Sequence, residues 1–253
     1  APGGVSTVRF EKKGDLLSYL YMTARDSNGA LVANLNWEKV IDRVQLYIGG
    51  QEIDSQDFQY MTDIEPVVGA QNMSQRYLGN GTASAQVMTN KVSTFFPLKL
   101  FFCKDWSVVL PLVALQFHDV EIRITWSSNL GASAIEAPTG SLPAGSTYQN
   151  LQYAFWTNFV YLDKDEREFF ASQEHNMLMT QVQRVPIGTA NMQELALAHP
   201  IKFLAFQSLQ YNSTGNYNAG ANTGNCDRMT LLTQINGSDV GEAKHLPHFV
   251  DVA

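Results

Sequence analysis

The sequence predicts an all-β protein, and three observations support that fold class. Apolar and polar residues alternate strictly from Val120 to Trp126, which is the two-residue period of a strand with one buried face. No segment shows the 3.6-residue period of a long amphipathic helix. The 253 residues also include 14 Phe and 10 Tyr, which favour strands, and 18 Gly, which favour turns.

The segment 95–126 is expected to form the centre of the fold, as two long strands joined by a corner at residues 104–107. Residues 95–102 are apolar on both faces of an extended chain, so they fit a strand that is covered on both sides. In the second strand, one set of side chains should point into the core and the other outward. The inward set is Val120, Ile122, Ile124 and Trp126, and the outward set is Glu121, Arg123 and Thr125.

Further strands and two short helices follow from the same rules. Asn36 is expected to cap a short helix at residues 37–41, and the charged segment 163–172 is expected to form a second one. Turns that contain glycine or Asn-Gly separate several of the apolar runs. The other expected strands are 5–11, 16–25, 44–48, 52–58, 151–162, 179–185, 201–209 and 229–235.

Two long segments lack any period and consist largely of small and neutral polar residues. They cover residues 60–91 and 127–150. Aperiodic segments of this length in a compact domain are usually functional or disordered loops. Both are therefore expected at the periphery of the molecule, facing outward or forming contacts between subunits.

A weak internal repeat suggests two related β-sandwiches. Residues 48–53 and 235–240 share the pattern I-x-G-x-x-[IV], and each follows an alternating strand at a hairpin turn. Composition and period change at 164–172, which is expected to link residues 1–163 to residues 173–253. The jelly roll of eight strands in two sheets is the candidate fold. The first half offers about seven strands and the second about four, so a tandem jelly roll with an incomplete second copy is expected.

Composition limits the partners and the redox state of the chain. The net charge of −7 argues against direct nucleic-acid binding, because such surfaces are normally basic. No run of 18 apolar residues is present, so no membrane span is expected. Cys103 and Cys226 could form a disulfide, but two reduced, partly buried thiols are the favoured interpretation.

No combination of residues predicts a catalytic, cofactor or metal site. His118 and Asp119 are neighbours on an expected strand and therefore point to opposite faces, which prevents a relay between them. His245 and His248 have an H-x-x-H spacing, but no third ligand accompanies them. No nucleophile elbow, P-loop or dinucleotide fingerprint occurs. The sequence therefore predicts a protein that is not an enzyme and that holds no cofactor and no metal.

Four N-x-[ST] sequons lie in expected loops or turns, where glycans could be attached. Segments rich in Asn, Ser and Thr also produce sequons by chance, so glycosylation is the less favoured interpretation. The four acceptor residues would be Asn72, Asn80, Asn212 and Asn236.

Eight aromatic side chains could form a platform for stacking against sugars. Most of them lie in strongly apolar runs, so packing in the core is the favoured role. They are Phe95, Phe96, Phe101, Phe102, Trp126, Tyr153, Phe155 and Trp156.

Several motifs together resemble the double jelly-roll major capsid proteins of nucleocytoplasmic large DNA viruses, in their algal-virus and iridovirus branches. An apolar-aromatic run is followed by residues 110–120, LPLVALQFHDV, which fit the family pattern L-P-L-x-A-L-x-[YF]-[HN]-[ED]-[VI]. The other matches come in the family's order and span nearly the whole chain. They are Val5-Ser6-Thr7, Gly14-Asp15-Leu16, residues 44–54, residues 160–163 with Glu166-Arg167, and residues 199–202.

The resemblance implies a structural function. A member of this family would form a homotrimer with a pseudo-hexagonal outline, and the trimers would tile an icosahedral shell above an internal membrane. Its partners would be copies of itself, neighbouring capsomers, minor capsid proteins and a penton protein. It would assemble in the host cytoplasm and reside in the virion capsid. Measured against the family, the first strand of the first jelly roll is expected to precede Val5, in a protein longer than this chain.

Two other functions are left open by the residues. A carbohydrate-binding β-sandwich would use the long loops as a glycan site. A cupin-like metalloenzyme is disfavoured because no complete set of metal ligands is present.

Overall fold

The computed structural model describes residues 1–32, 35–65, 92–131, 147–185, 192–197, 199–205 and 230–245. Contacts along the chain divide it into two units, Ala1–Pro200 and Ile201–Ala253. The first unit contains a β-sandwich, and the described part of the second contains two small ladders.

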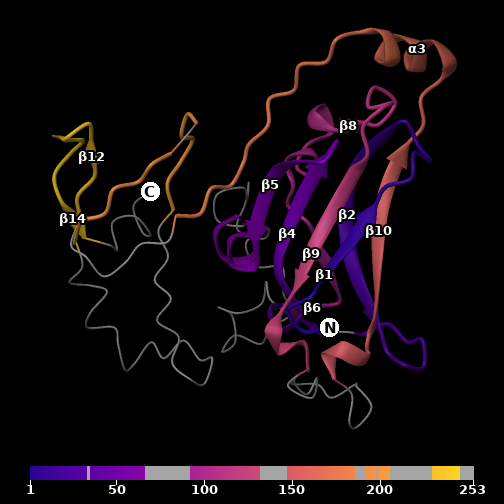
Figure 1. The fold of residues 1–253 in the computed structure, drawn as a ribbon, viewed down its shortest axis with the longest axis horizontal. Helices are drawn as coiled ribbons and strands as arrows, with labels where there is room; N and C mark the ends of the chain where they lie inside the picture. The colour runs from indigo at the N-terminus through magenta and orange to yellow at the C-terminus, as the bar shows by residue number, and fades with distance from the viewer. Residues whose placement is uncertain are drawn as a thin grey trace. The chain divides into compact units, whose positions relative to one another are not determined.

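Two antiparallel sheets face each other in the first unit (Figure 1). Their strands are β1 (Val5–Arg9), β2 (Leu16–Arg25), β4 (Ile41–Ile48), β5 (Gln51–Asp57), β7 (Phe95–Pro97), β8 (Leu110–Pro111), β9 (Val120–Trp126) and β10 (Gln152–Val160). One sheet has the order β1-β9-β4-β5, and the other has the order β10-β2-β7, with β8 also paired to β2. The remaining ladder of this unit joins β3 (Leu35–Asn36) to β6 (Val92–Ser93).

Short helices connect the strands. Asn36 caps the 3₁₀ helix Trp37–Lys39 as expected, because its side chain accepts a hydrogen bond from Glu38 N. Asp163 caps α3 (Lys164–Ser172) in the same way. Among the described residues, no helix is long and apolar enough to cross a membrane. The other short helices are the π-helix Tyr60–Ile64 and the 3₁₀ helices Phe101–Cys103, Trp106–Val108, Ser128–Gly131 and Tyr148–Asn150.

The connections identify the sandwich as a jelly roll. Between these two sheets the chain crosses from β1 to β2, from β2 to β4, from β5 to β7, from β8 to β9 and from β9 to β10, whereas the β4–β5 hairpin and the β7–β8 connection stay within one sheet. Such crossings generate the Greek keys of the jelly roll. The predicted all-β, jelly-roll fold is therefore confirmed.

The alternation in β9 places its side chains as the sequence predicted. Val120, Ile122 and Ile124 are buried, whereas Glu121 and its polar neighbours lie half-buried on the outer face. Trp126 differs in degree: it packs against the core but remains half-buried, and its indole donates to Ser6 Oγ at 2.7 Å. The core between the sheets is completed by β2 and β4, through Leu20, Met22, Ala24, Val44 and Leu46.

The prediction of one long strand over residues 95–102 is wrong. Only Phe95–Pro97 pairs with β2, and the chain then turns into the 3₁₀ helix Phe101–Cys103. Neighbouring residues of a strand point to opposite faces, but this helical turn brings Phe101 and Phe102 into the same core, with ring centroids 5.3 Å apart. Residues 95–102 are apolar at every position. This pattern fits a strand that is covered on both faces, but it equally fits a short strand followed by a buried helical turn.

The repeated pattern at 48–53 and 235–240 corresponds to two hairpins of the same type. Gly49 and Gly50 have φ angles of 60° and 82°, and Asn236 and Gly237 have φ angles of 52° and 78°. Positive φ at both central residues is the mark of a type I′ turn. The second hairpin joins β12 (Gln234–Ile235) to β13 (Ser238–Asp239).

Most strands that were predicted after residue 173 are not present in the described residues. Residues 179–185 and 201–205 are irregular, and the segment 229–235 contributes only β12 and β11 (Thr230–Leu231), which pairs with β14 (Lys244–His245). No closed second sandwich is therefore present among the described residues. The ends of the predicted loop 127–150 also differ from expectation, because Leu130 and Tyr148 are buried in the core. The rest of that loop and residues 66–91 lie outside the described residues.

Replacement of Gly14 by alanine is expected to destabilise the sandwich by about 1–3 kcal/mol, the usual cost of overpacking. A methyl group at Gly14 would lie 2.5 Å from Phe159 Cβ, so β10 would have to move away from the start of β2. Gly131 provides the control, because a Cβ there has only Pro2 Cγ nearby, at 3.9 Å. Urea unfolding should show a loss of stability in the Gly14→Ala variant alone, and equal midpoints for both variants would contradict the close approach.

Candidate interaction surface

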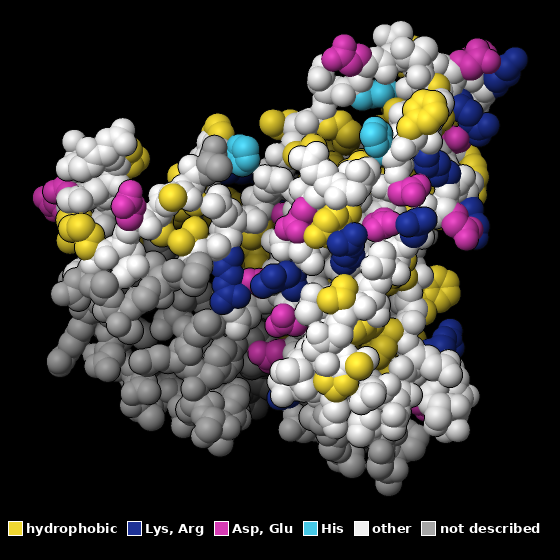
Figure 2. All heavy atoms as spheres, viewed as in Figure 1, with side chains coloured by type: hydrophobic (Ala, Val, Ile, Leu, Met, Phe, Trp, Pro, Cys, Tyr) yellow, Lys and Arg dark blue, Asp and Glu magenta, His cyan; other side chains and the backbone are white. Residues whose placement is uncertain are grey.

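The two sheets present outer faces of opposite character. The sheet β1-β9-β4-β5 carries a polar face, defined by Arg9, Tyr47, Glu52, Glu121 and Arg123. Figure 2 shows basic and acidic side chains intermixed over this part of the molecule. Arg9 and Arg123 lie 2.8 Å and 3.6 Å from the Glu121 carboxylate. The Arg123 guanidinium also lies 3.9 Å from the centre of the Tyr47 ring, and the Tyr47 hydroxyl donates to Glu52 at 2.7 Å. The charged groups of this face therefore have partners within the face.

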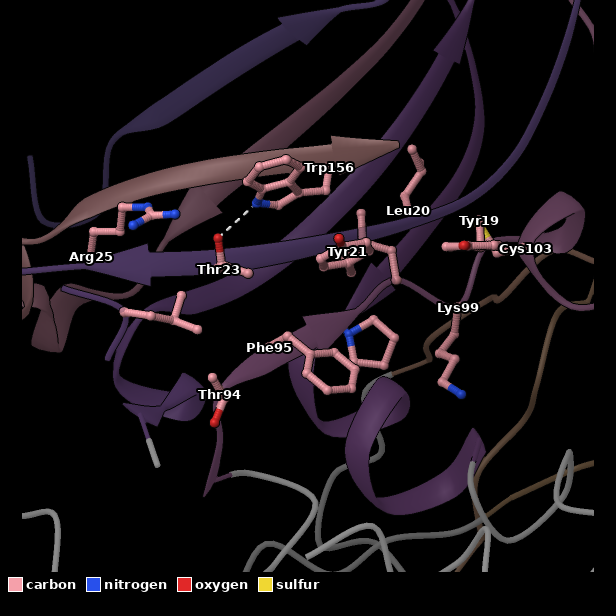
Figure 3. A pocket seen from close by; sticks show the side chains of 13 residues that line it. Tyr19, Leu20, Tyr21, Thr23, Arg25, Thr94, Phe95, Lys99, Cys103 and Trp156 are labelled. Carbon is pink, nitrogen blue, oxygen red and sulfur yellow. Dashed lines mark hydrogen bonds between the residues drawn. The ribbon is translucent and has the colours of Figure 1, made fainter. Parts of the chain in front are cut away.

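The other sheet carries an aromatic face, defined by Tyr19, Tyr21, Phe95 and Trp156 (Figure 3). The register places Tyr21 between Trp156 of β10 and Pro97 of β7 in one cross-strand row. Tyr21 stacks on Trp156 with a centroid distance of 6.2 Å and an interplanar angle of 9°, and it meets Phe95 edge-on at 6.0 Å. Three strands thus contribute to one continuous aromatic surface.

A groove of about 610 Å³ runs along the aromatic face. Tyr19, Phe95 and Trp156 remain 47%, 51% and 44% exposed, although each is a large apolar side chain. Inside the groove, Thr23 accepts a hydrogen bond from the Trp156 indole at 2.8 Å, which fixes the orientation of that ring. The rest of the lining includes two cationic side chains: Arg25, which is exposed and donates to the Gly29 carbonyl at 2.8 Å, and Lys99, which is paired with Glu65 at 3.6 Å. Its chemistry therefore suits a mostly apolar partner with some acidic character.

A second feature ties the helix α3 to the first sandwich. The Asp15 carboxylate is buried and accepts hydrogen bonds from Leu162 N at 2.8 Å and from Arg167 Nη2 at 2.9 Å. The hydrogen bond from Arg167 and the bond from the Leu162 amide lower the pKa of Asp15 below its ordinary value of 3.8. Asp15 and Arg167 both belong to motifs that carry the family resemblance, and their contact gives these motifs a structural role.

Replacement of Asp15 by alanine is expected to destabilise the protein by about 1–2 kcal/mol at pH 7, because the hydrogen bonds from Arg167 and Leu162 are lost. The expected loss of stability is modest because the Arg167 side chain is half exposed and water screens its ion pair with Asp15. The folded state depresses this pKa, so the stability due to Asp15 is present above pH 3.8 and disappears as the pH falls through the lower folded value.

Chemical denaturation at several pH values would measure this difference. The stability gap between the native protein and the Asp15→Ala variant should close in acid, whereas the exposed Asp165→Ala control should show no such gap. A gap that is constant down to pH 2 would contradict the role of the carboxylate.

A third feature is the strap, residues 181–184, which lies along β5. Val182 N donates to Asp54 Oδ1 at 2.9 Å, and Arg184 Nη1 lies 2.7 Å from Asp57 Oδ2. The Gln181 side chain donates to the Ile53 carbonyl. These bonds use side chains rather than a backbone ladder, which is why the predicted strand at 179–185 does not form.

The strap covers a polar group that lies inside the sandwich. Asp54 Oδ2 accepts from Gln56 Nε2 at 2.7 Å, and the same amide donates to the Lys99 carbonyl at 3.1 Å. Burial raises the pKa of Asp54 above its ordinary value of 3.8, while the hydrogen bonds from Val182, Gln56 and Ser55 oppose the increase. Asp54 therefore connects the strap, the edge strand β5 and the chain that follows β7.

The histidines that were considered in the sequence take no part in a metal or catalytic cluster that the structure describes. His118 and Asp119 precede β9 rather than lying on a strand, and Asp119 approaches Arg9, at 3.7 Å. His245 ends β14, and His248 lies outside the described residues. Groups of three or more metal-binding side chains are absent from the described residues.

The Asn residues of the four sequons lie mostly outside the described residues. This is the case for Asn72, Asn80 and Asn212, whereas Asn236 lies in the exposed turn between β12 and β13. Glycosylation at these positions stays the less favoured interpretation.

Cys103 is a free thiol, half-buried beside β2, and its Sγ lies 3.7 Å from the Ser18 carbonyl oxygen. Burial raises the pKa of this thiol to about 12, so the thiolate that attacks disulfides is scarce at neutral pH. Cys226 lies outside the described residues.

The predicted core role of the aromatic side chains is only partly correct. Phe96, Phe101 and Phe102 are buried, but Phe95 and Trp156 face outward on the aromatic face. The sequence did contain a signal for this face, which was missed: Tyr19 and Tyr21 alternate with the buried Leu20 and Met22 along β2. Two successive outward positions of β2 carry aromatic rings and the next two, Thr23 and Arg25, are polar, whereas a strand whose outer face meets water normally has polar residues at all of them.

Comparisons with known proteins agree with the fold. The chain is 29% identical over 210 residues to the major capsid protein of Pyramimonas orientalis virus, which covers 78% of this chain and 50% of that protein. It is 24% identical over 233 residues to the major capsid protein of Paramecium bursaria Chlorella virus 1, which covers 87% of this chain and 52% of that protein. The chain thus spans about half the length of these curated relatives.

A solved structure supports the same conclusion about the fold. The quasi-atomic model of the PBCV-1 virus capsid superposes with a TM-score of 0.65 at 22% identity, over 99% of this chain and 69% of that chain. The profile of the family described as "Major capsid protein N-terminus" matches residues 1–163, which include every strand from β1 to β10. The chain therefore belongs to the family of viral major capsid proteins, whose N-terminal domain forms its first sandwich.

Proposed function

We propose that this protein builds a viral shell by forming homotrimers of pseudo-hexagonal outline, which tile an icosahedral capsid. This proposal is supported chiefly by one observation: the residues that match the family model, 1–163, are the same residues that form the jelly roll. Function in a shell consists of burying surface at repeated contacts. With only 16% charged residues, many identical copies can pack together without strong mutual repulsion.

The proposed division of the chain is a first jelly roll at 1–163, a linker at 164–172 and part of a second jelly roll at 173–253. The edge strand β10 supports the view that the first jelly roll takes up one more strand. Its nine residues include no Lys, Asp, Glu or Pro, and among the described residues it pairs with β2 alone. Natural edge strands are usually protected by such residues or by a cover. A strand that precedes Val5 in the whole protein would pair with β10. It would extend the β10-β2-β7 sheet by one strand, so that this sheet would match the four strands of the other.

The proposed partners are those of a shell protein. They are other copies within the trimer, neighbouring capsomers, minor capsid proteins and a penton protein, with an internal membrane nearby. Assembly is proposed to take place in the host cytoplasm. The net charge of −7 favours contacts with proteins over direct contact with nucleic acid.

This function requires no catalysis, cofactor or metal. The curated relatives are described as capsid proteins, which supports a structural role. A second candidate function, carbohydrate binding, is favoured by one observation: the exposed rings of the aromatic face could stack on sugars.

Size-exclusion chromatography with light scattering on the full-length protein distinguishes the two functions. The shell function predicts a stable particle with three times the mass of one chain. A monomer whose melting temperature rises in the presence of oligosaccharides would contradict it and favour the carbohydrate-binding module.

A further inference from the structure

The two outer faces of the sandwich differ in the polarity of their side chains, and contact with water alone does not explain this difference. A β-sandwich that is surrounded by solvent normally carries polar side chains on both outer faces. Here the polar face follows that rule, with its charges paired to one another. The aromatic face breaks it, because Tyr19, Phe95 and Trp156 each expose between 44% and 51% of their surface. Contiguous exposed apolar surface of this kind marks a site of association.

The composition of the aromatic face matches that of protein interfaces. Tyr, Trp, Phe and Arg are enriched in the buried centres of interfaces, and Tyr, Trp and Arg dominate their binding energy. Tyr21 and Trp156 are held in place by their mutual stacking and by the bond from Trp156 to Thr23. Rings that are already ordered lose little conformational entropy when a partner packs against them.

The position of the strap indicates which partner is available to this face. Within Ala1–Pro200, the chain that follows α3 is bound to β5, the edge strand of the opposite sheet, through Val182 and Arg184. Among the described residues of Ala1–Pro200, the chain after α3 is thus anchored at β5, and none of it lines the groove of the aromatic face. In addition, the groove holds the exposed Arg25, which complements a chain with a net charge of −7, whereas Lys99 is already paired with Glu65 at 3.6 Å.

We propose that the aromatic face packs against a second copy of this chain in the assembled trimer. The proposal rests on the proposed function and specifies one of its contacts. A closed ring of three copies requires heterologous contacts, in which one surface meets a different surface of the next copy. The aromatic face is one side of that contact, and a more acidic surface of the neighbouring copy is the other.

The first test introduces a charge into the centre of the contact in the full-length protein. The Tyr19→Glu variant should raise the dissociation constant of the trimer by roughly thirtyfold or more, the effect of a hot-spot residue. Phe117→Glu is the matched control, because Phe117 is 93% exposed and lies outside the aromatic face. Melting of the monomer at high dilution confirms that both variants fold. A trimer that dissociates equally in both variants would overturn the proposal.

A second test keeps the aromatic character of the face and identifies its neighbour. A photoactivatable benzoylphenylalanine at position 19 should crosslink one copy to another, and mass spectrometry of the crosslinked peptides identifies the partner surface. The proposal would be overturned by crosslinks that are confined to a single chain. It would also be overturned if the face bound an added oligosaccharide and formed no crosslink between copies. In both cases a trimer in solution would still support the shell function. A full-length protein that forms no trimer at all would instead overturn the shell function itself.

Discussion

Replacement of Trp37 by alanine is expected to lower the free energy of unfolding by about 3–5 kcal/mol, the range for removing a buried aromatic side chain. Trp37 is 0% exposed, and its ring lies 5.7 Å from that of Phe96 and 6.3 Å from that of Tyr153. Its indole also donates to the Ser93 carbonyl at 3.0 Å. The alanine variant would leave a cavity between the sheets and an unpaired carbonyl, which urea unfolding monitored by circular dichroism would detect.

Trp106 provides the control for this prediction, because it is 64% exposed. The Trp106→Ala variant should change the stability by no more than about 0.5 kcal/mol, as is usual for exposed positions. Similar losses for the two variants would show that the core of the sandwich is not centred on Trp37.

Replacement of Asp54 by alanine is expected to cost about 2–3 kcal/mol, because buried donors lose their acceptor. These donors are the amides of Ser55 and Val182 and the side chain of Gln56. The strap should also become accessible to proteases, since its bond to β5 through Val182 is lost. Urea unfolding and limited proteolysis of the same samples would measure both effects.

Asp57 serves as the comparison, since it also contacts the strap but at the surface. Its partners Arg43 and Arg184 are about half exposed, and the loss of such pairs usually costs less than about 1 kcal/mol. An Asp57→Ala variant that is as unstable as Asp54→Ala would contradict the importance of the buried carboxylate.

The two buried carboxylates should also respond oppositely to pH. The folded state raises the pKa of Asp54, so its contribution to stability becomes more favourable as the pH falls from the raised value towards 3.8, and is lost as the pH rises. Asp15 has the opposite sign, because its pKa is lowered. The stability gap between native protein and Asp54→Ala should therefore widen in mild acid.

Elements with a clear period could be predicted from the sequence. The alternation in β9 and β4 indicates strands with one buried face. The turn residues Gly49-Gly50 and Asn236-Gly237 have positive φ angles, which these residue types adopt readily. Both signals are local, because each depends only on residues that are close in the sequence. The segment 95–102 could not be placed in this way. A run that is apolar throughout carries no period, and its break after Pro97 depends on how Phe101 and Phe102 fit between the sheets.

The candidate surfaces depended more strongly on the tertiary structure. Tyr19 and Tyr21 alternate in the sequence, but the aromatic face exists only because the register sets Tyr21 beside Trp156, 135 positions further along the chain. The same is true of the strap, where Val182 reaches Asp54 across 128 positions. Side-chain hydrogen bonds of this kind leave no pattern in a single sequence, which explains why a strand was expected at 179–185.

The most direct test of the shell function is an electron cryomicroscopy reconstruction of the full-length protein in solution. The proposed function predicts a threefold particle with six sandwich-shaped densities in a pseudo-hexagonal ring, and the further inference predicts that a neighbouring copy covers the aromatic face of each first sandwich. A particle of one chain, with the polar and aromatic faces both open to solvent, would contradict the function proposed for this protein.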